Sequence, residues 1–251
     1  MVIEQPIIHN RFIVKEIFEL MKKQGTYKGL FSCPSSLTIT TCRNSGPMTD
    51  RIIPELEGYE DVSLLESSLQ HLGIHTLKRL ESSELPWRNT FKFELINEYL
   101  KECKTEYFMC CDAIDVIFRD DPFKVLDIFE SFDCDMLFMS TDSLDGYDCM
   151  PEVFNEVKKL NNNNGRYLNS GVYIGRTNFV REVIEECMEY AIPHGVTMDD
   201  YKEYLNSKPK TYPKGAQDQS RLRQLCNQNH LSQIQYNVFL HSFQTYNSFL
   251  S

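Results

Sequence analysis

Two aspartates, Asp112 and Asp115, follow an apolar, strand-like run and are the residues of this chain best placed to do chemistry. The run covers 107–111, and apolar residues resume at 116–118. In an open α/β sheet, ligands bind at the carboxyl ends of the strands. Two carboxylates there can share one hard divalent cation, which prefers oxygen ligands and commonly bridges to substrate phosphates. The segment therefore indicates a metal-dependent enzyme acting on a phosphorylated donor, and the alternative is that both aspartates cap turns after a buried strand.

Three further features have both a chemical and a structural interpretation. The segment 168–175 reads LNSGVYIG, which is either a place where a ligand approaches the backbone closely or a bulge in a core strand. Asp218 stands at the start of a predicted helix, where it is either an N-cap or a carboxylate aimed into the site. Lys92 opens the helix before the aspartate strand, and it either neutralises a diphosphate or is a solvated surface lysine.

Histidine and cysteine do not form a recognisable metal motif. Of the six histidines, His241 in the apolar segment 238–243 is the one that we consider as a third metal ligand. The nine cysteines are an odd number and lack CxxC spacing, so we interpret the thiols as reduced, mostly core-filling residues of a cytosolic protein. A zinc site is not expected, because Cys and His do not cluster at ligand spacing.

Composition limits the classes of protein that fit. A chain of 251 residues with 41% hydrophobic residues suits one large α/β domain, or two small ones, with a substantial core. The net charge of −10 argues against non-specific nucleic-acid binding and fits a protein that gathers cations. Charged residues interrupt the apolar stretches of 1–25, so we expect neither a signal peptide nor a membrane span and predict a cytoplasmic location.

Strand-like and helical patterns alternate along most of the chain, which predicts an α/β fold. The predicted strands are short apolar or β-branched runs at 37–42, 74–80, 107–111, 135–140 and 167–175. The predicted helices have apolar residues at helical spacing and cover 10–24, 63–72, 90–103, 123–132, 179–190 and 219–228.

The order of the motifs resembles the glycosyltransferase domain of the procollagen lysyl hydroxylases and related collagen glycosyltransferases. The shared order is a strand ending in Asp-x-x-Asp, then Leu-Asn-Ser-Gly-x-x-Ile-Gly, then Asp-Gln, and it extends over 37–243. The resemblance implies the GT-A architecture, a Rossmann-like fold with a mostly parallel central sheet. We accordingly divide the chain into an N-terminal helical extension, 1–30, and a GT-A-like glycosyltransferase domain, 31–251.

The resemblance also implies roles for single residues. Asp112 and Asp115 correspond to the metal-binding aspartates of the family, with Mn²⁺ or Mg²⁺ as the cofactor. The other implied donor-site residues lie at the end of the first strand, at the lysine downstream of Trp87, in the Asn-Ser-Gly segment and in the Asp-Gln pair: Thr40, Thr41, Lys92, Asn169, Ser170, Gly171 and Asp218.

The chain departs from the family pattern in three places. The glycines that the family has between the tryptophan and the lysine are replaced by 88–91, which read RNTF. Met150 stands where the family has the tryptophan of its Cys-Trp-Pro segment. The family's later His-Gly motif, which supplies a metal-binding histidine, is expected beyond Gln244 and does not occur in the sequence, so His241 is considered in its place.

The leading prediction is a metal-dependent hexosyltransferase that moves glucose or galactose from a UDP-sugar to a protein or glycan hydroxyl. Asp218, Asn169 and Lys92 are the expected catalytic-site residues. Lys92 would assist the metal in neutralising the diphosphate, Asn169 would orient the donor sugar, and Asp218 would bind sugar hydroxyls or the acceptor.

Two other functions remain open. A metal-dependent phosphohydrolase also uses paired aspartates after a strand, although Ile114 and Val116 stand where its Asp-x-Asp-x-Thr pattern requires an aspartate and a threonine. A catalytically inactive nucleotide-sugar-binding module would keep the fold without turnover.

Overall fold

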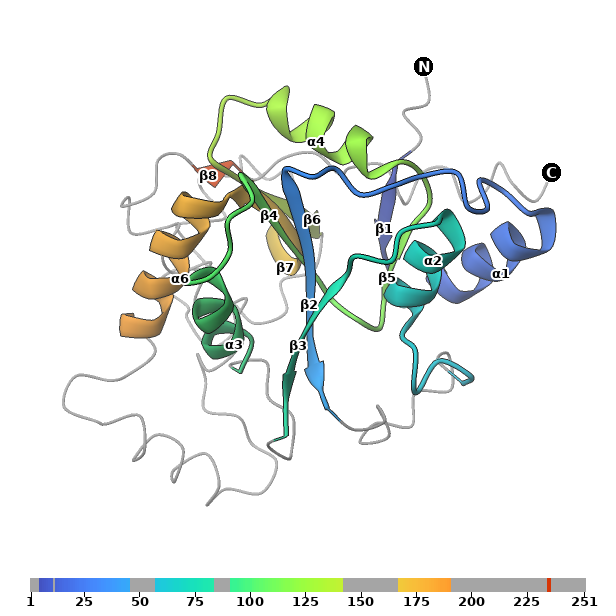
Figure 1. The fold of residues 1–251 in the computed structure, drawn as a ribbon, viewed down its shortest axis with the longest axis horizontal. Coiled ribbons are helices and arrows are strands. Elements are labelled where there is room, and N and C mark those ends of the chain that lie inside the picture. Colours follow the sequence, from blue (N-terminus) through green and yellow to red (C-terminus); the bar gives the residue numbers. More distant parts are fainter. Residues whose placement is uncertain are drawn as a thin grey trace.

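A mixed six-stranded sheet is the centre of the computed structural model, which describes residues 5–10, 12–45, 57–83, 91–141, 167–190 and 234–235 (Figure 1). Its strand order is β3-β2-β4-β7-β6-β8. The strands are β2 (Leu37–Asn44), β3 (Lys78–Ser82), β4 (Tyr107–Cys111), β6 (Met136–Thr141), β7 (Tyr167–Arg176) and β8 (Ile234–Gln235). Three of the five strand pairs are parallel, and β7 runs antiparallel to both of its neighbours. The α/β class predicted from the sequence is confirmed.

Strand β4 is buried on both faces of the sheet. Successive side chains of a strand point to opposite faces, so Met109 and Cys111 enter one core cluster, whereas Phe108 and Cys110 enter the other. Burying each large apolar side chain stabilises the fold by about 1.5–3 kcal/mol. The strand that carries the aspartates at its end is therefore firmly held on both sides.

Helices cover both faces of the sheet (Figure 1). Helices α1 (Val14–Gln24), α2 (Leu64–Leu72) and α4 (Pro122–Glu130) contribute to the cluster that contains Met109. Helices α3 (Phe91–Leu100) and α6 (Thr177–Tyr190) contribute to the cluster that contains Phe108. No helix among the described residues is long and apolar enough to cross a membrane.

Helix α2 shows how local signals fix the element ends. Ser63 is its N-cap, and its hydroxyl and the Glu66 side chain form a capping box, which satisfies backbone donors at the helix start. Gly73 ends the helix in the left-handed conformation at φ 98°, which glycine adopts without steric cost. Ile74 is still part of this helix cap, because its amide donates to the Leu69 carbonyl at 2.8 Å. The strand that was predicted to start at 74 therefore begins only at Lys78.

The N-terminal segment adds a strand that the sequence analysis missed. Strands β1 (Ile7–His9) and β5 (Val116–Phe118) pair antiparallel as a separate two-stranded sheet, and the side chain of Ile7 is fully buried. Three residues are too few to show a strand period. The helix predicted from 10 begins at Val14, because Asn10 forms a turn in which its side-chain oxygen accepts from the Phe12 amide at 3.0 Å.

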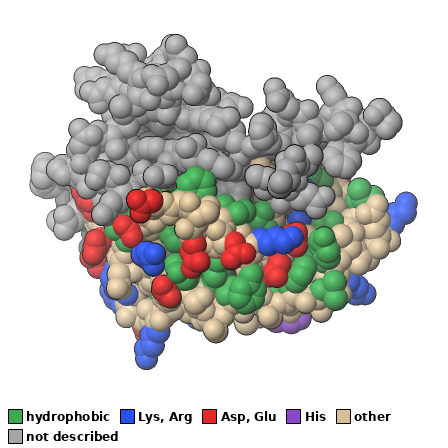
Figure 2. Space-filling model, turned by 90° about the horizontal axis from the view of Figure 1, so that it is seen from above, with side chains coloured by type: hydrophobic (Ala, Val, Ile, Leu, Met, Phe, Trp, Pro, Cys, Tyr) green, Lys and Arg blue, Asp and Glu red, His purple; other side chains and the backbone are tan. Residues whose placement is uncertain are grey.

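Other element ends differ by a few residues from those predicted. Helix α3 ends at Leu100 and α6 begins at Thr177, and the two-residue β8 was not predicted. The predicted helix 219–228 lies outside the described residues. On the face shown in Figure 2, acidic and basic side chains lie side by side among apolar ones over the described part of the chain.

Candidate active site

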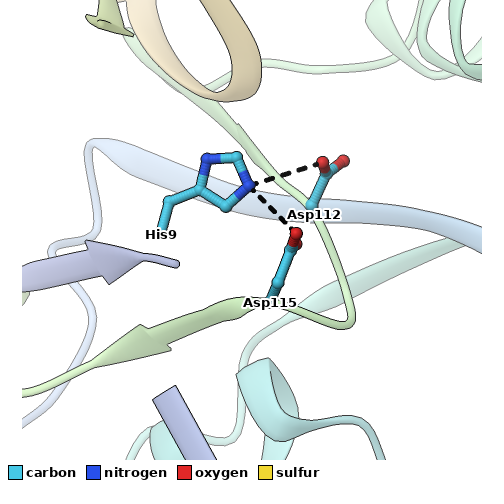
Figure 3. A group of neighbouring side chains, drawn as sticks. All are labelled: His9, Asp112 and Asp115. Carbon is cyan, nitrogen blue, oxygen red and sulfur yellow. Dashed lines mark ion pairs between the residues drawn. The ribbon is translucent and has the colours of Figure 1, made fainter. Parts of the chain in front are cut away.

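The two aspartates lie at the carboxyl end of β4. Asp112 follows the last residue of β4 directly, and Asp115 directly precedes β5, so both belong to the short turn that joins the two strands (Figure 3). Both side chains are partly exposed, at 29% and 25%. A ligand at this edge of the sheet can therefore reach both carboxylates.

Backbone hydrogen bonds from three different elements hold this turn in place. The Asp112 amide donates to the Gly171 carbonyl of β7 at 2.7 Å, and the Asn10 amide, just after β1, donates to the Asp115 carbonyl at 2.9 Å. The Leu65 amide at the start of α2 donates to the Ala113 carbonyl at 3.3 Å. The carboxylates are thus attached to a backbone whose position is set by the core.

His9 from β1 lies against both carboxylates (Figure 3). Its Nε2 is 3.3 Å from Asp115 Oδ2 and 3.9 Å from Asp112 Oδ2. The three residues are a candidate metal cluster, with one ligand atom from each and all three atoms within 4.8 Å of one another. The sequence analysis missed His9 because it lies about a hundred residues before the aspartates and outside any ligand-spaced motif.

The charges in this cluster shift one another's protonation. Burial alone would lower the pKa of His9, but the hydrogen bond with Asp115 and the charges of Asp115 and Asp112 outweigh it, and the pKa is raised. Burial alone would raise the pKa of Asp115, but the hydrogen bond and charge of His9 and the charge of Lys92 outweigh it, and the pKa is lowered. Both shifts favour the charged form of the side chain, imidazolium at His9 and carboxylate at Asp115.

Lys92, near the start of α3, also reaches the cluster. Its Nζ is 2.6 Å from Asp112 Oδ1, and its side chain is 12% exposed. The two oxygens of Asp112 thus have different neighbours, Lys92 at Oδ1 and His9 at Oδ2. The lysine singled out in the sequence lies directly beside the predicted metal aspartates.

The Asn-Ser-Gly segment of β7 lies beside the same turn. Asn169 Oδ1 accepts from the Gly171 amide at 2.7 Å, and Ser170 is buried. The register of the β6–β7 pair shifts opposite this segment, between Phe138 and Met139. The strand irregularity that the sequence analysis gave as the alternative to a ligand contact is therefore present. It lies beside Gly171, whose carbonyl accepts from the Asp112 amide.

Thr40 and Thr41 are fully buried in β2. Their hydroxyls donate to the carbonyls of Met109 at 2.9 Å and Cys111 at 2.8 Å. In the structure they tie the middle of β2 to the aspartate strand, and contact of these two residues with the nucleotide stays a prediction. The remaining predicted site residues lie outside the described residues: Trp87, Met150, Asp218 and His241.

The arrangement fits a divalent cation. Around an octahedral ion with bonds of about 2.1 Å, neighbouring ligand atoms are about 3 Å apart and opposite ones about 4 Å apart. The separations of 3.3 Å and 3.9 Å within the cluster lie in this range. Carboxylate oxygens suit Mg²⁺ and Mn²⁺, and an imidazole nitrogen is a common transition-metal ligand.

An α/β domain whose central strand ends in an Asp-x-x-Asp turn with a candidate metal cluster has the architecture of the GT-A class. Residues 62–192 match the PLOD GT domain, the glycosyltransferase domain of procollagen lysyl hydroxylases. The match covers more than half of the chain, and the chain belongs to this family. A search of curated proteins found no match.

The matched range includes most of the described site. Lys92, Asp112, Asp115 and Asn169 lie within 62–192, whereas His9 lies outside it. The family implies a glycosyltransferase-type function with a nucleotide-sugar donor.

Proposed function

We propose that this protein is a metal-dependent hexosyltransferase that moves glucose or galactose from a UDP-sugar to a hydroxyl group of a protein or glycan. The observation that carries the proposal is the pair Asp112 and Asp115, at the carboxyl end of a buried strand, with Lys92 2.6 Å from Asp112. For the catalytic domain we propose 31–251, with 1–30 as an extension attached through β1 and α1.

Asp112 and Asp115 are the residues that would hold Mn²⁺ or Mg²⁺, and the cation supplies Lewis-acid neutralisation of the diphosphate leaving group. Lys92 adds a second positive charge at the same place. Stabilisation accelerates the reaction only where it grows toward the transition state, and negative charge on the leaving diphosphate grows in this way. Asn169 and Ser170 orient the donor sugar, and Gly171 is kept as a donor-site residue from the family resemblance.

Two residues of the proposal lie outside the described residues. We assign Asp218 to the sugar hydroxyls or the acceptor, and we do not assign it as a base. The assignment of Thr40 and Thr41 to the nucleotide is kept as a proposal from the family resemblance, and His241, which the sequence offers in place of the family's histidine, is kept as a candidate third ligand of the metal.

The proposal predicts that Asp112→Asn and Asp115→Asn each lower turnover of UDP-glucose or UDP-galactose by about 100-fold or more, because each weakens the charge stabilisation of the leaving group. The measurement is UDP release in the presence of Mn²⁺, with and without candidate acceptors. Asp127→Asn is the matched control, because Asp127 is exposed on α4.

Full turnover in both aspartate variants would contradict the proposal. Release of phosphate from simple esters, without use of UDP-sugars, would favour the phosphohydrolase. Donor binding without turnover would favour the inactive binding module.

A further inference from the structure

We infer that His9 is a third protein ligand of the divalent cation held by Asp112 and Asp115. The inference rests on the proposed function, since it concerns the same cation. It does not rest on the family match, because His9 lies outside the matched residues 62–192. It would make the N-terminal strand β1 part of the metal site.

The position of His9 is fixed by strand pairing. His9 pairs with Val116 in the β1–β5 register, next to Asp115. The following residue, Asn10, donates its amide to the Asp115 carbonyl at 2.9 Å. Because the backbones of β1 and the aspartate turn are joined on both sides of His9, the imidazole is held facing the two carboxylates (Figure 3).

Gly171 leaves the space that the imidazole occupies. A Cβ at Gly171 would lie 2.1 Å from His9 Cε1 and 2.7 Å from both ring nitrogens. Gly171 is not among the glycines with positive φ, so its lack of a side chain matters for space rather than for backbone conformation. Gly171 thus leaves room for the ring of His9, and the Gly171 carbonyl accepts from the Asp112 amide.

The three side chains offer one compatible donor set. Asp112 is engaged with Lys92 through Oδ1, and its Oδ2 is the oxygen that His9 Nε2 approaches at 3.9 Å. Asp115 Oδ2 approaches the same nitrogen at 3.3 Å. One nitrogen and two carboxylate oxygens therefore converge on a single place, and the nitrogen favours Mn²⁺ over Mg²⁺, which prefers oxygen ligands.

The test is Mn²⁺ binding by the full chain, measured by calorimetry and by pulsed electron paramagnetic resonance. The wild-type protein should show coupling of the Mn²⁺ electron spin to an imidazole nitrogen. His9→Gln should lose this coupling, and its Mn²⁺ affinity should fall by at least about 10-fold, with a smaller change in Mg²⁺ affinity. His75→Gln is the control, because His75 is exposed, and it should retain both the coupling and the affinity.

The outcomes separate this inference from the proposed function. If Asp112→Asn abolishes Mn²⁺ binding but the wild-type protein shows no nitrogen coupling, the role of His9 is overturned and the proposed function stands. Unchanged Mn²⁺ affinity and coupling in His9→Gln would overturn the role of His9 in the same way. Absence of Mn²⁺ binding by the wild-type protein, with or without UDP, would overturn both. The spectroscopic result on the wild-type protein does not depend on the folding of any variant.

Discussion

Under the proposed function, Asp112 is the residue at which two cations would compete. Its Oδ1 pairs with Lys92 at 2.6 Å, and its Oδ2 faces His9 and the place proposed for the metal. Like charges at short range repel, so Lys92 would weaken binding of the proposed metal while no donor is present. With a diphosphate bound, the same lysine and the proposed metal would act on one anion and support each other.

Lys92→Ala should therefore have opposite effects on two ligands. The affinity for Mn²⁺ alone should rise, because a nearby positive charge is removed. The affinity for UDP in the presence of Mn²⁺ should fall by about 10- to 100-fold, since a charged hydrogen bond contributes about 1.5–3 kcal/mol. Calorimetric titrations with each ligand measure both effects.

Lys101→Ala is the matched control for the lysine prediction. Lys101 directly follows α3 and pairs with Glu98 in an ion pair whose side chains are 59% and 76% exposed. Exposed pairs contribute little, so neither affinity should change. Equal UDP affinity in Lys92→Ala and the wild-type protein would remove Lys92 from the donor site.

Three separate elements meet at the site, and their contacts explain why a glycine is needed in β7. The carbonyl of Gly171 fixes Asp112, and the absence of a side chain admits His9 from β1. Gly171→Ala should destabilise the metal-free protein by about 1–3 kcal/mol, the usual cost of overpacking. Chemical denaturation of the variant measures this cost.

A double-mutant cycle identifies the cause of that cost. In a His9→Ala background the ring is gone, so the added methyl group has room and Gly171→Ala should cost much less. The coupling free energy between the two positions should therefore be large, as for residues in direct contact. Additive effects would mean that the glycine is needed for another reason.

The elements near the site differ in how far the sequence predicts them. The buried run of β4 and the helical spacing of apolar residues in α2 are local signals, and they predict both elements well. Strand β1 has three residues and gains its stability from pairing with β5, which no local pattern shows. The two aspartates and Lys92 were found from short motifs, whereas His9 was missed because only the folded chain brings it to them.

At the scale of the whole molecule, the sheet and its two helical layers place the predicted donor-site motifs at one edge. Lys92 comes from α3, the aspartates from the end of β4, and the Asn-Ser-Gly segment from β7. Helix α3 is anchored in one of the two large core clusters that line the sheet, and β4 and β7 are anchored in both. The candidate site is therefore built on elements that the core holds in place.

The measurement that tests the central claim most directly is calorimetric titration of the whole protein with UDP, with and without Mn²⁺. We predict binding that requires Mn²⁺, and its loss in Asp112→Asn but not in Asp127→Asn. The bound ligands should also raise the free energy of unfolding, by about 2.7 kcal/mol when the ligand is at 100 times its Kd. UDP binding that is the same without Mn²⁺, or that persists in Asp112→Asn, would contradict a donor site built on this metal.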